Sequence, residues 1–206
     1  RIRRVGRSDT MIKIDYAIHL VMTVFLIFGV YQFYFWCQRH PQTETRRFAA
    51  PLDERIPFWP SWAWIYSFLY YPAIAYLNWT VSSPRQFNHV AMSFFVLLAA
   101  QMVFFLFFPV ATPSHWRSIN RGRSLSERFL RFVHRFDAPN NCFPSMHVSV
   151  ATLTALHASS TLGTPALLFP VLIALSCVFT KQHYLADLPT GAALGWGAYS
   201  VYQWMG

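Results

Sequence analysis

Charged side chains are scarce in this chain, at 12% of its 206 residues, whereas 54% of the residues are hydrophobic. Ordinary soluble domains carry roughly a quarter charged residues. The scarcity excludes such a domain, and we expect much of the chain to lie in a lipid bilayer.

Acidic residues and cysteines are also few. The eight Asp and Glu residues form no carboxylate cluster of the kind that holds Mg²⁺. Cys37, Cys142 and Cys177 show neither CxxC spacing nor the even count of a disulfide framework. We therefore expect no metal site and no cofactor. Cys37 and Cys142 fall on one predicted membrane face, where a disulfide is one alternative, but free thiols are the favoured interpretation.

The formal net charge of +9 also occurs in nucleic-acid-binding proteins. A DNA-binding surface needs a soluble basic face, however, and these cations lie between apolar segments. The charge favours a lipid headgroup or an anionic membrane surface as the partner, and no nucleic acid.

Six apolar segments predict transmembrane helices. Four are runs of about 20 residues without an internal charge, the length that crosses a hydrocarbon core. The other two are shorter and carry Ser, Thr, Gly and Pro, which is typical of helices packed inside a bundle. The first segment is too long for a signal-peptide core, so we expect it to remain as an anchor. The predicted spans are residues 18–36, 62–81, 90–110, 148–161, 165–180 and 188–205.

No internal repeat is visible, so we expect one all-α domain over residues 1–206, a bundle of six transmembrane helices. Alternating spans place the loops 37–61, 111–144 and 180–186 on one face. Between spans three and four, residues 124–136 carry apolar side chains at helical spacing among arginines. This pattern predicts a basic amphipathic helix at the membrane interface. Either contact with the membrane alone or direct contact with a substrate would explain it.

The sequence CFPSMH at residues 142–147 has the composition of a helix start, with Pro144 or Ser145 as the cap. The free N–H groups of Ser145, Met146 and His147 at such an end favour a bound anion. His147 would be able to give a proton to an oxygen held there.

The sequence TKQHYLAD at residues 180–187 places Asp187 four residues after His183. On a helix this spacing puts the carboxylate beside the imidazole, where it holds one ring nitrogen as N–H and leaves the other as a nucleophile. Ionisable groups at the end of apolar spans are usually functional. The remaining histidines are better explained as interfacial polar residues, namely His19, His40, His89, His115, His134 and His157.

The two motifs together resemble the type 2 phosphatidic acid phosphatase superfamily, whose signature comprises K-x6-RP, PSGH and SR-x5-H-x3-D. The segment 144–147 matches the second block with Met146 in place of glycine, and Ser176, His183 and Asp187 match the third in spacing. The resemblance covers most of the chain, because that family folds as six helices with its motifs on one face.

Two departures from the signature concern the phosphate ligands. Cys177 replaces the arginine of the third block, and K-x6-RP is absent. We expect Lys181, Arg117, Ser145 and then Arg123 to bind phosphate instead. The motifs F-P-S-x-H at residues 143–147 and H-Y-x-x-D at residues 183–187 are similar to those of the inositol phosphorylceramide synthases and their bacterial relatives.

The resemblance implies attack by His183 on phosphorus, with His147 as the proton donor and Asp187 orienting His183. The expected function is a metal-independent lipid phosphatase acting through a phosphohistidine on a phospholipid or polyprenyl phosphate. A phosphotransferase that uses an alcohol acceptor remains the alternative. A non-catalytic lipid-phosphate carrier is disfavoured by the complete set of motif residues, and a bis-histidine haem protein by the position of both histidines at span ends.

Two opposing features bear on orientation. Most of the 17 Lys and Arg residues lie on the motif-bearing face, which by the positive-inside rule would be cytoplasmic. A phosphate site recruits cations for its own chemistry, however, and the basic N-terminal tail holds the opposite face in the cytoplasm. We expect the motifs on the extracytoplasmic face of a plasma or inner membrane.

Overall fold

The computed structural model describes residues 9–48 and 50–205, and within these ranges the chain is all-α, without a β-strand. The predicted helical class is thus confirmed. The basic tail used to predict the orientation, residues 1–7, lies outside the described residues. The elements are α1 (Asp9–Arg39), α2 (Pro51–Arg55), η1 (Pro60–Trp62), α3 (Ala63–Phe68), α4 (Tyr70–Thr80), α5 (Pro84–Phe107), α6 (Ser114–Ser118), α7 (Leu125–Phe136), α8 (Met146–Leu162), η2 (Thr164–Leu167), α9 (Leu168–Phe179) and α10 (Asp187–Met205).

Each of the six predicted spans is largely helical, but two are divided. The span 165–180 begins in the 3-10 helix η2 before α9. The predicted span 62–81 is divided into α3 and α4 at Leu69. Pro72 explains the division, because it has no N–H for the carbonyl of Phe68 and its ring crowds that carbonyl.

Helix length alone identifies fewer spans than the sequence predicts. The stretches Ile14–Arg39 and Pro84–Phe107 are long and apolar enough to cross a membrane. By contrast, α8 has 17 residues and α9 has 12, less than the roughly 20 of a full span. The predicted count of six therefore depends on how the helices are arranged and not on their individual lengths.

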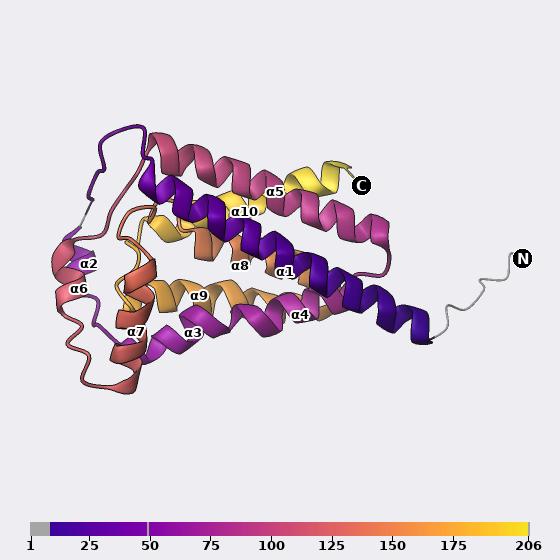
Figure 1. Cartoon of the computed structure of the whole chain (residues 1–206), viewed down its shortest axis with the longest axis horizontal. Coiled ribbons are helices and arrows are strands. Elements are labelled where there is room, and N and C mark those ends of the chain that lie inside the picture. Colours follow the sequence, from indigo (N-terminus) through magenta and orange to yellow (C-terminus); the bar gives the residue numbers. More distant parts are fainter. Residues whose placement is uncertain (1–8, 49, 206) are drawn as a thin grey trace, which may run out of the picture.

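The long helices run side by side along the long axis of the molecule (Figure 1). At one end lie the short helices α2, α6 and α7 with the loops that carry both histidine motifs, and at the opposite end lies the C-terminus. The loop after α1 joins this motif end, where Arg46 and Val110 form an isolated β-bridge. The prediction that both motifs emerge at the same end of the bundle is confirmed.

Two glycines bring α10 against α8. A Cβ atom at Gly191 would lie 2.5 Å from the carbonyl oxygen of Ser145, and one at Gly195 would lie 2.4 Å from that of Ser149. Small residues four apart allow such close backbone approach in helix pairs. The backbone N–H of Ser145 also donates to the carbonyl of Asp187, with 3.1 Å between N and O. The starts of α8 and α10, and hence the two motifs, are held together.

Helix α7 is the amphipathic helix predicted between the third and fourth spans. Ser124 caps it and forms a capping box with Glu127. Phe129 stacks on Trp64 of α3 at a ring-centroid distance of 4.5 Å. Because the contact lies at the start of the α3–α4 stretch, α7 lies across the motif end of the bundle.

Candidate functional site

His183 lies in the turn between α9 and α10 and is 5% exposed. Its Nδ1 is 2.7 Å from the carbonyl oxygen of Cys142 and 3.3 Å from Oδ2 of Asp187. A carbonyl oxygen only accepts hydrogen bonds, so a neutral His183 carries its proton on Nδ1. The lone pair is then on Nε2, the nitrogen that a nucleophile needs.

The contact between Asp187 and His183 was predicted, but its structural basis is different. The spacing predicts both residues on one helix, whereas His183 precedes α10 and Asp187 is its first residue. Asp187 Oδ2 also accepts the backbone N–H of Tyr184 at 2.8 Å. The Asp187 carboxylate thus stabilises the turn that leads into α10, and this turn places the His183 imidazole beside the carboxylate.

His147 is the second residue of α8 and follows the cap residue Ser145 by two positions. Its ring centroid is 5.7 Å from that of His183, and the two imidazoles are arranged edge to face, with 65° between their planes. Tyr66 of α3 stacks on His147, and its Oη is 3.3 Å from Nδ1 of His147. Tyr70 Oη donates to the His147 carbonyl at 2.5 Å. His147 is therefore fixed within reach of a group bound at His183.

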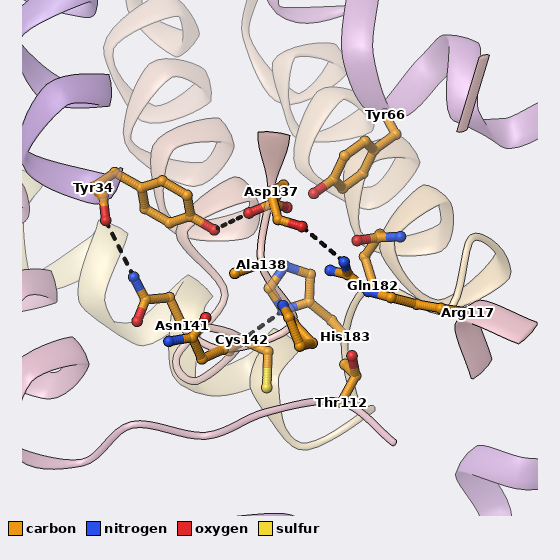
Figure 2. A pocket seen from close by; sticks show the side chains of 12 residues that line it. Tyr34, Tyr66, Thr112, Arg117, Asp137, Ala138, Asn141, Cys142, Gln182 and His183 are labelled. Carbon is orange, nitrogen blue, oxygen red and sulfur yellow. Dashed lines mark hydrogen bonds between the residues drawn. The ribbon is translucent and has the colours of Figure 1, made fainter. Parts of the chain in front are cut away.

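A small cavity adjoins His183, with a volume of about 10 Å³. This is close to the space that one water molecule needs. Tyr34, Tyr66, Arg117 and Asp137 line it together with His183 (Figure 2). The cavity brings together side chains from α1, α3, α6 and the motif loops, so it forms only in the folded bundle.

Arg117 is the predicted phosphate ligand that reaches this cavity. Its Nη1 donates to the carbonyl oxygens of Asp137 at 2.8 Å and of His134 at 3.4 Å. These bonds hold the guanidinium at the cavity wall. Burial lowers the pKa of Arg117, while the nearby Asp137 opposes that shift.

The other predicted phosphate ligands do not line the cavity. Lys181 has a left-handed backbone with φ of 58° and directs its Nζ to the carbonyl of Asp53, at 2.6 Å. Arg123 is exposed in the loop before α7. Ser145 uses its Oγ to cap α8 by accepting the N–H of Val148.

The anion site predicted at the start of α8 also needs a correction. Its predicted donors were the N–H groups of residues 145–147, but the N–H of Ser145 is taken by the carbonyl of Asp187. The first turn of α8 therefore offers fewer free donors than the sequence pattern indicates.

Asp137 is a cavity residue that the sequence reasoning missed. Its Oδ1 accepts from Tyr34 Oη at 3.0 Å and from Gln38 Nε2 at 2.7 Å, both on α1. Burial raises the pKa of Asp137, while the hydrogen bonds from Gln38 and Tyr34 act in the opposite direction. No short motif marks this contact, because α1 lies about a hundred residues earlier in the chain.

The last question about the site concerns disulfides and metal ligands among the described residues. Cys37, Cys142 and Cys177 are free and buried, so the expected free thiols are confirmed. Among the described residues, no group of three or more His, Cys, Asp or Glu side chains is arranged to hold a metal ion.

A comparison with known protein families identifies this chain. The profile described as the PAP2 superfamily matches residues 45–201, which include both histidine motifs. No curated protein and no solved structure matches the chain significantly. Since the match covers well over half of the chain, the protein belongs to the PAP2 superfamily.

Proposed function

We propose that the protein is a membrane-embedded lipid phosphatase that works through a phosphohistidine on His183. The hydrogen bond from His183 Nδ1 to the Cys142 carbonyl carries this proposal, because it leaves Nε2 unprotonated. Figure 2 draws the ring beside the cavity with Nδ1 directed to Cys142. Membership of the PAP2 superfamily supports phosphatase chemistry in general.

The proposed reaction has two balanced steps. In the first, Nε2 of His183 forms a bond to phosphorus as the bond to the lipid oxygen breaks, and His147 gives that oxygen a proton. In the second, the oxygen of a water molecule forms a bond to phosphorus as the phosphorus–nitrogen bond breaks, and His147 takes a proton from that water, so phosphate leaves and Nε2 of His183 regains its lone pair. Asp187 stabilises the positive charge that develops on the His183 ring.

Arg117 is our proposed ligand for the equatorial phosphoryl oxygens, where charge builds in the transition state. For Lys181 and Ser145 we propose supporting roles that match their contacts. Lys181 ties the nucleophile's turn to α2 through the Asp53 carbonyl, and Ser145 caps the helix that carries His147. Arg123 is exposed and does not line the cavity, so we propose it only as a surface cation.

A membrane location is proposed from the outer surface of the bundle. Large apolar side chains are exposed on α1 and α10, for example Phe25 at 72%, Phe28 at 65% and Trp204 at 88%. Surfaces of this kind are covered by lipid or by a partner in stable proteins. We propose six spans in one domain, with the motif end on the extracytoplasmic side.

Transfer to an alcohol is the second candidate, and Asp137 favours it. A carboxylate repels a phosphate but accepts a hydrogen bond from a hydroxyl. Arg117 and Asp137 both line the one-water cavity, so a hydroxyl that enters it would find an acceptor in Asp137 beside a phosphoryl group carried by His183. This candidate also fits the likeness to inositol phosphorylceramide synthases. A non-catalytic carrier would have no use for the paired imidazoles.

The test is an assay of the purified chain with a panel of phospholipid and polyprenyl phosphates, with and without lipid alcohols and with EDTA present. Free phosphate and new lipid are both measured. We expect turnover in EDTA and a loss of at least about 10³-fold in the His183→Ala variant. His40→Ala is the matched control, since His40 is exposed and outside the cavity. Full activity of His183→Ala, or a strict Mg²⁺ requirement, would reject the mechanism.

A further inference from the structure

A second cavity shares the wall residue Arg117 with the first and lies between α6 and α7. Its volume is about 470 Å³, and it is lined by Arg117, Asn120, Arg131, His134 and Arg135. Gln182 of the small cavity is 2.6 Å from His134 of this one, atom Nε2 to atom Nε2. The two cavities are therefore neighbours, separated by one layer of side chains. We call this second cavity the arginine pocket.

The lining of the arginine pocket is positively charged. No carboxylate lines it, and among the described residues neither Arg131 nor Arg135 forms an ion pair. Asp137 lies outside the lining but close enough to Arg117 to stabilise the charge of that one guanidinium. Burial, with a contribution from nearby Arg117, lowers the pKa of His134 to about 4. Its ring is neutral at pH 7, so the charge of the pocket comes from its three arginines.

The local backbone makes room for the pocket's side chains. Gly122 has a left-handed φ of 71°, and a Cβ atom there would lie 2.5 Å from Nη1 of Arg131. Arg131 also donates to the carbonyl of Arg121, at 3.4 Å. Asn120 is nearly buried and donates to the carbonyl of Glu127 at 3.1 Å. A side chain at position 122 would therefore crowd Arg131 in the position that it takes here.

An apolar stripe on α7 adjoins the pocket. Phe132 is 54% exposed and Phe136 is 63% exposed, and their ring centroids are 5.1 Å apart. Each follows an arginine of the pocket in sequence, so on a helix the two faces are neighbours. An occupant that satisfies both faces has an anionic head for the arginines and an apolar body for the phenylalanines.

We infer that the arginine pocket binds the phosphate of an anionic phospholipid that is not the substrate. The headgroup lies between Arg131 and Arg135, and the acyl chains lie along Phe132 and Phe136. This site is distinct from the nucleophile's cavity and shares with it only the wall residue Arg117. A bound lipid would hold α7 on the membrane surface beside the entrance to the catalytic cavity.

The test measures binding directly, so it does not depend on the proposed reaction. The purified full chain in detergent is titrated with dioctanoyl phosphatidylglycerol, dioctanoyl phosphatidylcholine and inorganic phosphate by microscale thermophoresis. The pocket variant is Arg131→Gln with Arg135→Gln. The matched control is Arg123→Gln with Arg128→Gln, which removes the same charge from positions that do not line the pocket.

We expect phosphatidylglycerol to bind more tightly than phosphatidylcholine, and the pocket variant to bind it at least about tenfold more weakly than the control variant. The His183→Ala variant should bind it as tightly as the unchanged chain, even if that chain proves to have no phosphatase activity. Equal affinity in the pocket and control variants overturns the inference. The inference is also overturned if inorganic phosphate binds as tightly as phosphatidylglycerol and its binding depends on Arg131 and Arg135 in the same way. The site would then be one for a free anion.

Discussion

At the residue scale, the nucleophile has two acceptors for a single proton. Nδ1 of His183 is closer to the Cys142 carbonyl, at 2.7 Å, than to Asp187, at 3.3 Å. A backbone carbonyl cannot be titrated or removed by substitution. The tautomer of His183 is therefore held by the chain itself, and Asp187 adds charge and position.

This division of labour predicts a graded effect of substituting Asp187. Asp187→Asn removes the negative charge but leaves the Cys142 carbonyl in place. We expect kcat for phosphate release to fall about 10- to 100-fold. Loss of the correct tautomer costs roughly 10⁴-fold in a serine protease triad. A loss as large as that of His183→Ala would show that Cys142 does not hold the tautomer.

The thermal stability of Asp187→Ala, compared with that of Asp187→Asn, tests the structural role of the same carboxylate. Alanine leaves the buried N–H of Tyr184 without its acceptor, whereas asparagine keeps an oxygen there. An unpaired buried donor costs about 1–3 kcal/mol. The alanine variant should therefore melt at a lower temperature than the asparagine variant, as measured by thermal unfolding in detergent.

Several site residues were predictable because their partners are close in sequence or lie in motifs at the same end of the bundle. His183, Asp187 and His147 belong to this group, and Arg117 was among the expected phosphate ligands. Asp137 was not predictable, since its partners Tyr34 and Gln38 come from α1. Lys181 was proposed for phosphate, but a left-handed turn directs it to Asp53, and backbone handedness at a lysine leaves no mark in the sequence.

At the element scale, the contact between α8 and α10 positions the site. The glycines at 191 and 195 let the helices approach until backbone atoms nearly touch. Gly197 is on the same helix, but a Cβ atom added there would have no neighbouring atom within 4 Å. It therefore offers a comparison in the same sequence context.

Alanine substitution of these glycines should have opposite effects. Gly197→Ala gains helix propensity of up to about 1 kcal/mol without a clash, so its melting temperature should be unchanged or slightly higher. Gly195→Ala would place Cβ against the Ser149 carbonyl, and overpacking costs about 1–3 kcal/mol. Its melting temperature in detergent should fall by several degrees. Equal melting temperatures would mean that the two helices are not packed at Gly195.

Helix positions were predictable from apolar length, and the cap of α7 from its Ser124 and Glu127 spacing. The interruption at Leu69 was missed, although Pro72 was visible. An apolar run long enough to span a membrane outweighed a single proline in that prediction. Which faces of α8 and α10 meet was also not predicted, because α10 carries Gly197 as well as Gly191 and Gly195, and the sequence alone does not show which of them face α8.

At the scale of the whole molecule, the bundle has a motif end and an opposite end. The proposed six spans place Ser118 at the motif end, with Ser82 and Thr164 at the other. Two of the helical stretches are apolar and long enough to cross a membrane by themselves. For the other helices, the side of the membrane on which each one begins and ends has to be determined from the positions of these turns.

Labelling of single cysteines tests this arrangement. Ser118→Cys, Ser82→Cys and Thr164→Cys all lie at exposed positions, in a background with Cys37, Cys142 and Cys177 changed to serine or alanine. With a membrane-impermeant maleimide on intact spheroplasts, we expect labelling at position 118 and not at 82 or 164. Detergent should then allow labelling at all three. Labelling of position 118 together with either of the others in intact cells would contradict six spans.

The narrowness of the cavity beside His183 bears on the competition between water and alcohols. A space of about 10 Å³ admits solvent one molecule at a time. In the proposed mechanism, the lifetime of the phosphoenzyme is then set by access and not by the abundance of bulk water. A lipid alcohol that arrives from the bilayer with its hydroxyl already oriented would compete well with water for the phosphoenzyme. Small changes in the side chains that line the cavity would then shift the ratio of hydrolysis to transfer.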